Sequence, residues 1–289
     1  MKSLYIYQCD QPLSSEFVEG DLERMKFIPP MPQSMESSGW SPFEDNFAIL
    51  APPYAVMQYR QDKKILPKST VEDEMAQRSE SMGDLNASEK RQLKEDVLMH
   101  LRPKAFSRRQ DVSVIWHQAL KQIWVGTSSA TRADATMECI LQTWPGLRAT
   151  RWLDNHALRS ALTNALKEDK WPEGVTAADK VVMVHPQEQK RKVAIQGVDA
   201  SYEGVMSWLN QGFVVQQLKL VYDGKVEMTF SEQGYWSAIK DLTVNDILDE
   251  AENDPHVRLW HQCALIESLV KVWEPWLQEV EACLETTVS

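Results

Sequence analysis

Hydrophobic and polar positions change their period several times along the chain, which predicts short strands mixed with helices. Alternating apolar residues predict strands at 4–8, 47–59, 65–66, 112–116, 121–126, 180–184 and 192–198. Spacings of three and four residues predict helices near 18–25, 134–143, 155–167 and 201–211, the first of them capped by Ser14 or Ser15. Because strands and helices do not alternate as βαβ units, the sequence predicts an α+β fold with mixed sheets and helices.

Two C-terminal patterns add detail to this expectation. Residues 213–230 predict a hairpin around a three-residue loop, Asp223–Lys225, and one face of it carries Val214, Leu218, Leu220, Tyr222, Val226, Met228 and Phe230. Further on, helical spacing relates Val257, Trp260, Ala264, Val272, Trp273, Trp276 and Val280. Pro275 should kink this helix or begin a second one.

Residues 69–100 differ from the rest of the chain. They are highly charged and almost free of aromatic residues, with a break near Gly83. Ser88 can cap the second of two helices, whose apolar stripe is Leu93, Val97 and Leu101. Because this stripe is thin, the helical pair should project from the body instead of forming its core.

Composition limits the class of protein. The chain has 289 residues and a formal net charge of −11, which by itself argues against a polyanionic partner such as nucleic acid. The sequence contains no long, charge-free apolar run of the kind that predicts a membrane span. Its N-terminus lacks the pattern of a signal peptide. The four cysteines form no C-x-x-C pair. We therefore expect a cytoplasmic protein with free thiols.

Motifs for catalysis are absent from the sequence. It contains no phosphate-binding glycine loop, no H-E-x-x-H zinc motif and no G-x-S-x-G nucleophile motif. The six histidines are scattered, and the acidic segment 241–254 has helical spacing where a metal-binding loop would need a tight turn. We therefore expect no enzymatic activity, no cofactor and no metal site.

Positive charge, in contrast, is concentrated in two acid-free stretches. Residues 97–110 contain Arg102, Lys104, Arg108 and Arg109, and residues 189–198 contain Lys190, Arg191 and Lys192. Flexible cations at such density suit phosphate contacts, which dominate sequence-independent binding to DNA. Phe106 lies among the first group, where an aromatic ring is either buried or presented to a partner.

Four stretches of the sequence resemble the RdgC family of recombination-associated proteins. They are Phe27-Ile28-Pro29 through Gly39-Trp40, Lys64-Ile65-Leu66-Pro67, Leu93 through Pro103-Lys104-Ala105-Phe106-Ser107-Arg108, and the strand pattern around Asp199 and 212–220. The order and spacing fit over nearly the whole chain, and the third stretch is the most specific.

The resemblance implies a homodimer closed into a ring around double-stranded DNA, which limits access of the RecA recombinase. It implies a central body (1–67 and 107–170), a helical tip (68–106) and a base domain (171–289). Phe106 matches the family phenylalanine at the dimer contact, and Lys104 matches a family cation. The family's basic pair and polar residue before Asp199 are replaced here by Gln196, Gly197 and Val198.

Two functions therefore remain open from the sequence. The first is a nucleoid-associated, non-enzymatic ring that binds duplex DNA without sequence preference and inhibits RecA-mediated recombination. The second is a protein-interaction module of a mobile element that antagonises a host recombination or defence protein. A ring with an acidic outside and a basic lining would reconcile the net charge with DNA binding.

Overall fold

The computed structural model describes all residues except 14–17, 81, 84, 153–154, 189, 199–202, 243–254 and 289. Its first part contains β1 (Leu4–Cys9), α1 (Val18–Arg24), β2 (Glu36–Ser41), β3 (Ala48–Ala51), β4 (Tyr54–Ile65), α2 (Lys68–Glu80), α3 (Ala87–Leu101) and the 3-10 turn η1 (Arg102–Lys104). It continues with β5 (Phe106–His117), β6 (Gln122–Val125), α4 (Ala130–Thr143), β7 (Ala149–Arg151) and α5 (Asn155–Glu168). The last part contains β8 (Val175–Val184), β9 (Lys192–Gln196), α6 (Glu203–Asn210), β10 (Val214–Tyr222), β11 (Val226–Ser231), β12 (Tyr235–Asp241) and α7 (Pro255–Val288).

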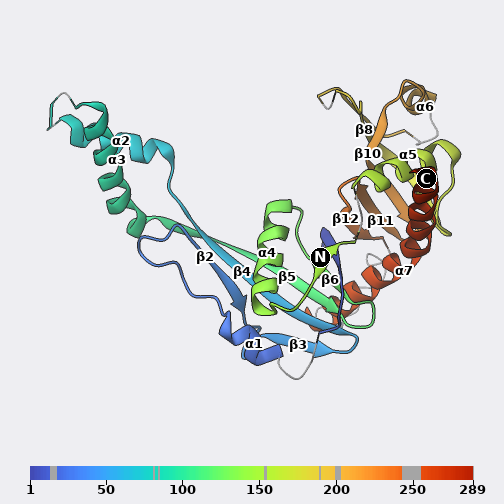
Figure 1. The fold of residues 1–289 in the computed structure, drawn as a ribbon, viewed down its shortest axis with the longest axis horizontal. Coiled ribbons are helices and arrows are strands. Elements are labelled where there is room, and N and C mark those ends of the chain that lie inside the picture. Colours follow the sequence, from blue (N-terminus) through green and yellow to red (C-terminus); the bar gives the residue numbers. More distant parts are fainter. Residues whose placement is uncertain are drawn as a thin grey trace.

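One sheet runs through the whole molecule. Among the described residues it has 12 strands in the order β2-β4-β5-β6-β1-β12-β11-β10-β8-β9, with β3 beside β4 and β7 beside β1. Its strand pairs are antiparallel, and helices cover parts of it without regular alternation (Figure 1). The expected mixture of strands and helices is therefore confirmed.

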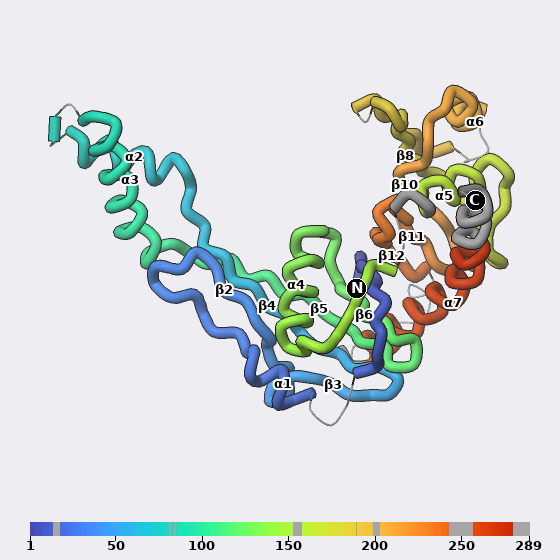
Figure 2. Tube along the Cα trace, in the orientation of Figure 1, coloured from blue at the N-terminus to red at the C-terminus, as the bar shows by residue number. Residues whose placement is uncertain are grey.

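The helical pair α2–α3 is inserted between two long paired strands. β4 and β5 pair from Tyr54 opposite His117 to Ile65 opposite Phe106, and both helices lie between them in the chain. They therefore extend beyond the end of this ladder, at one end of the molecule (Figures 1 and 2). Their small core is separate from the others and contains Val71, Leu93 and Val97. Asn86, not Ser88, caps α3, because its side chain accepts from the backbone N–H groups of Ser88 and Glu89.

Buried side chains on the middle strands alternate between the two faces of the sheet. One cluster contains Met57, Tyr59 and Val112 with residues of α1 and α4. The other contains Val56 and Ile115 with residues of α5, α6 and α7. Because successive side chains of a strand point to opposite faces, α4 and α7 lie on opposite faces of the middle strands.

The β10–β11 hairpin has the expected three-residue loop, but its predicted face was partly wrong. Register shifts in the pairing of β10 with β8 bury Val215 completely, and Val214 is only half-buried. Leu218, Leu220, Val226, Met228 and Phe230 are buried as expected. A β-bulge changes which residues face the core, and this explains the difference.

The stripe predicted on the C-terminal helix was also partly wrong. Its buried residues are Cys263, Ile266, Leu269, Val270, Trp273 and Leu277, whereas Val257 and Ala264 are exposed. Pro275 lies inside one continuous helix and does not begin a second one. The proposed cap residues Ser14 and Ser15, the side chain of Val280, Asp199 and most of the acidic segment 241–254 lie outside the described residues.

Candidate nucleic-acid interface

The first group of predicted cations lies where the helical pair joins the sheet. Arg102 and Lys104 belong to η1, which follows α3 directly, and Arg108 and Arg109 belong to the first part of β5. Lys104, Arg108 and Arg109 are exposed, whereas Arg102 is half-buried. The Lys104 ammonium lies 2.7 Å from Nε2 of His100, one turn back on α3. These four cations therefore lie at the junction between the projecting helices and the sheet.

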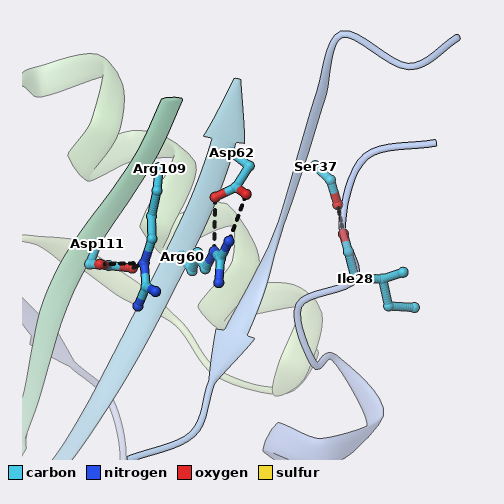
Figure 3. A network of polar contacts seen from close by, with 6 residues as sticks. All are labelled: Ile28, Ser37, Arg60, Asp62, Arg109 and Asp111. Atoms are coloured by element: carbon cyan, nitrogen blue, oxygen red, sulfur yellow. Dashed lines mark hydrogen bonds and ion pairs between the residues drawn. The ribbon is translucent and has the colours of Figure 1, made fainter. Parts of the chain in front are cut away.

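The strand separates Arg108 from Arg109. The side chains of neighbouring residues in a β-strand point to opposite faces of the sheet. Because β5 already begins at Phe106, Arg108 and Arg109 both lie in this strand and point to opposite faces. Arg109 lies on the face that carries Arg60, Asp62 and Asp111 (Figure 3). Its Nε donates to both carboxylate oxygens of Asp111, at 2.9 and 2.7 Å. The Arg109 charge is therefore compensated locally.

A second ion pair lies beside the first. Arg60 donates to both oxygens of Asp62, at 2.8 and 2.7 Å, and its guanidinium stacks 4.1 Å from the ring of Phe27. Hydrogen bonds from Arg60 lower the pKa of the buried Asp62 carboxyl, and the Arg109 charge adds to this effect. The two arginines and two aspartates thus form an electrically neutral group on this face.

The proline-rich segment covers the same face further toward the helical pair. Lys64 is only 7% exposed, and its ammonium donates to the carbonyl oxygens of Met31 and Pro32 at 2.9 and 2.6 Å. Gln33 donates to the Met99 carbonyl on α3, and Ser37 donates to the Ile28 carbonyl (Figure 3). We call residues 27–35 the proline strap. Lys64 holds the strap onto the sheet, and Gln33 ties it to the helical pair.

The opposite face of the ladder is open at this end. Ile65 and Phe106 are 51% and 87% exposed and lie directly opposite each other. The next pair along that face is Lys63 opposite Arg108. Sequence reasoning missed Lys63 and Ile65 as site residues because it began the strand at Val112. The long register of β4 with β5 is what brings them beside Arg108 and Phe106.

Carboxylates lie beside the cations on this open face. A hollow of about 290 Å³ is lined by residues of β2, β4 and α4, including Glu36 and Glu138. The hollow reaches Gln61 and Glu36, and Glu36 lies directly opposite Lys63 in the β2–β4 register. The pair Lys63–Arg108 therefore lies at the edge of this hollow, with the Glu36 carboxylate beside Lys63.

The second group of predicted cations lies at the other end of the sheet. Lys190 and Arg191 lie in the turn between β8 and β9, Lys192 begins β9, and all three are exposed. The Arg191 guanidinium lies 5.5 Å from the centre of the Phe213 ring, which holds it in place. Within one chain the structure does not bring this group near Arg102–Arg109, because the two groups lie on the two ends of the molecule (Figure 1).

A partly buried polar cluster joins α7 to the middle strands. The Glu267 carboxylate accepts from the Tyr54 hydroxyl, pairs with Lys271, and lies 3.3 Å from Nε2 of His117. Nδ1 of His117 accepts from the Leu120 N–H, so the neutral ring directs its Nε2–H toward Glu267. Burial would raise the pKa of Glu267, but donors from Lys271, Tyr54 and His117 outweigh burial and lower it to about 2.

In the part of the chain that the structure describes, no group of three or more His, Cys, Asp or Glu side chains could hold a metal ion. No described helix is both long enough and apolar enough to cross a membrane.

Comparison with known proteins places the chain in a family. The family model described as "Putative exonuclease, RdgC" matches residues 1–268. The recombination-associated protein RdgC of Proteus mirabilis is 25% identical over 265 residues, covering 88% of this chain and 86% of that protein. The proteins of the same name from Yersinia enterocolitica and Sodalis glossinidius are 25% and 24% identical, with the same coverage. The chain therefore belongs to the RdgC family, whose named relatives are recombination-associated proteins.

Proposed function

We propose that this protein binds double-stranded DNA through its phosphates, with little dependence on sequence, and modulates recombination by restricting access of RecA to the duplex. The observation that supports this most directly is the concentration of exposed cations around Phe106 in a chain of net charge −11. Membership of a family of recombination-associated proteins supports the same function. In a cell, the protein would act on the nucleoid.

The working form that we propose is a homodimer closed into a ring. Phe106 is 87% exposed, and an aromatic side chain loses its contact with water only when a partner covers it. A second copy that covers Phe106 would join the two chains at the helical end. The basic turn Lys190–Lys192 at the other end would complete a positive lining, with Arg102, Lys104 and Arg108 at the first end. Arg109 is left out of this lining, because Asp111 compensates its charge.

One observation favours a second candidate. Gln196, Gly197 and Val198 stand where relatives are expected to have a basic pair and a polar residue, and the net charge is strongly negative. A protein-interaction module that engages a basic partner would need no such pair. This candidate predicts weak or no binding to duplex DNA.

Binding and cleavage of DNA can be measured together. Fluorescence anisotropy with two labelled duplexes of unrelated sequence, at increasing salt and with or without Mg²⁺, distinguishes the candidates. We expect equal affinities for the two duplexes, a steep loss with salt and intact DNA afterwards. Absence of binding at low salt would overturn the proposal in favour of the interaction module. Shortened DNA that appears only with Mg²⁺ would instead support the nuclease activity in the family description.

A further inference from the structure

Lys63 and Arg108 form a pair of like charges on neighbouring strands. The β4–β5 register places them directly opposite each other, one pair inward from Ile65 and Phe106. Residues that lie directly opposite each other on neighbouring strands have adjacent side chains on the same face of the sheet. Both side chains are exposed. The fold therefore sets two cations side by side, although they are 45 residues apart in the sequence.

The protein itself does little to neutralise this pair. The Lys63 ammonium lies 3.8 Å from a carboxylate oxygen of Glu36, and both side chains of that ion pair are more than half exposed. Arg108 forms no ion pair within the part of the chain that the structure describes. Like charges held directly opposite destabilise a sheet. An anion bound between them would remove this unfavourable term.

Arg109 provides the contrast. It follows Arg108 in the sequence but lies on the other face, where Asp111 takes both of its short hydrogen bonds and Asp62 lies opposite it. That face also holds the buried Lys64 and the proline strap. Arg109 therefore has a structural partner, whereas Arg108 and Lys63 face solvent.

We infer that Lys63 and Arg108 together bind the phosphodiester backbone of DNA, and that Lys63 is a DNA contact that the acid-free stretches of the sequence do not reveal. The inference rests on the proposed duplex binding and names the face of the sheet that meets the DNA. Two flexible cations suit a phosphate, because charge neutralisation needs no fixed geometry. The exposed ring of Phe106 lies next to the pair, and Gln61 and Gln110 lie on its other side as neutral donors.

The inference is tested by the salt dependence of binding to one labelled duplex, measured by anisotropy for Lys63→Ala, Arg108→Ala and the double variant. Removal of one phosphate contact lowers the slope of log K against log salt by about 0.9. We expect this decrease for each single variant and about twice as much for the double variant. Arg109→Ala is the matched control, because it removes an adjacent arginine from the other face and should leave the slope unchanged. Lys63→Gln replaces Lys63→Ala if the alanine variant folds poorly by circular dichroism.

The outcomes separate this inference from the proposed function. Failure of the wild-type protein to bind duplex would overturn the proposed function. Wild-type binding with unchanged slopes in the Lys63 and Arg108 variants, or with the loss confined to Arg109→Ala, would overturn the inference alone. Light scattering without DNA gives the remaining outcome: loss of a dimer in Lys63→Ala and Arg108→Ala would assign the pair to a second copy of the chain and overturn its assignment to DNA.

Discussion

Ile65 and Phe106 lie directly opposite each other as the last pair of the β4–β5 ladder, and both side chains are exposed. The pair marks the point where the sheet ends and the helical pair begins. The proposed contact with a second copy would lie at this apolar pair.

Phe106→Ser should weaken dimer formation. Loss of a central aromatic anchor costs about 2 kcal/mol or more, which corresponds to about a thirtyfold higher dissociation constant for the dimer. Sedimentation equilibrium at several protein concentrations measures this constant. Leu50→Ala changes another exposed apolar residue, on β3 and 44% exposed; it is the control and should leave the constant unchanged. An unchanged dimer in Phe106→Ser would remove Phe106 from the interface.

Lys64→Met should destabilise the protein. Its ammonium holds the Met31 and Pro32 carbonyl groups at the proline strap, and loss of the donor leaves these carbonyl groups unpaired. We expect the free energy of unfolding in urea to fall by about 1–3 kcal/mol. Lys63→Met changes the neighbouring residue on the open face and should have little effect. Equal effects of the two substitutions would show that the strap does not depend on Lys64.

Gly39→Ala should be disruptive because the backbone of another segment touches this position. A Cβ atom at residue 39 would lie 2.7 Å from the Met25 carbonyl oxygen and 2.7 Å from the Phe27 nitrogen. Residues 25 and 27 also exchange hydrogen bonds with Trp40, so the segments cannot separate freely. We expect a loss of about 1–3 kcal/mol in thermal or urea unfolding. Gly20→Ala, with open space around its Cβ, should instead stabilise α1 by about 0.5–1 kcal/mol.

Acid should destabilise the junction between α7 and the middle strands. Burial lowers the pKa of His117 below 6.5, so the unfolded chain binds a proton that the folded chain does not, and stability falls as pH drops below about 6.5. Glu267 has a pKa of about 2 when folded and an ordinary value of 4.5, so its contribution is complete above 4.5 and is lost toward pH 2.

The Glu267 contribution can be isolated by substitution. Glu267→Gln should flatten the pH dependence of unfolding between 4.5 and 2, measured by urea titrations at each pH. Glu95→Gln removes an exposed carboxylate paired with Arg91 and should leave that dependence nearly unchanged. A wild-type pH profile in Glu267→Gln would show that the carboxylate does not stabilise the junction.

Local patterns predicted most elements of the fold but not the points where tertiary pairing overrides them. The spacing of Leu93 and Val97 predicted the core of the helical pair correctly. The register shifts of β10 bury Val215 in place of Val214. They depend on the pairing of β10 with β8, so the alternation of apolar and polar residues along β10 does not predict them. Ser88 was chosen as a cap on residue type, whereas Asn86 and Glu89 together complete a capping box.

The candidate site was predictable only in composition. Charge counting identified Arg108 and Arg109 as members of one group, but residues 106–111 have few strand-forming side chains. Their strand exists because β4 pairs with them as far as Ile65. That pairing separates Arg108 from Arg109 and brings Lys63 to Arg108, and the spatial neighbour of a strand cannot be read from the chain alone.

The central claim, a closed dimer around duplex DNA, is tested most directly by retention on circular and linear DNA. The protein is bound at low salt to a covalently closed circular duplex and to the same DNA after linearisation, and both are then moved to high salt. The account predicts that protein remains on the circle, because a ring cannot slide off it, and leaves the linear DNA through its ends. Equal release from both forms would contradict encirclement.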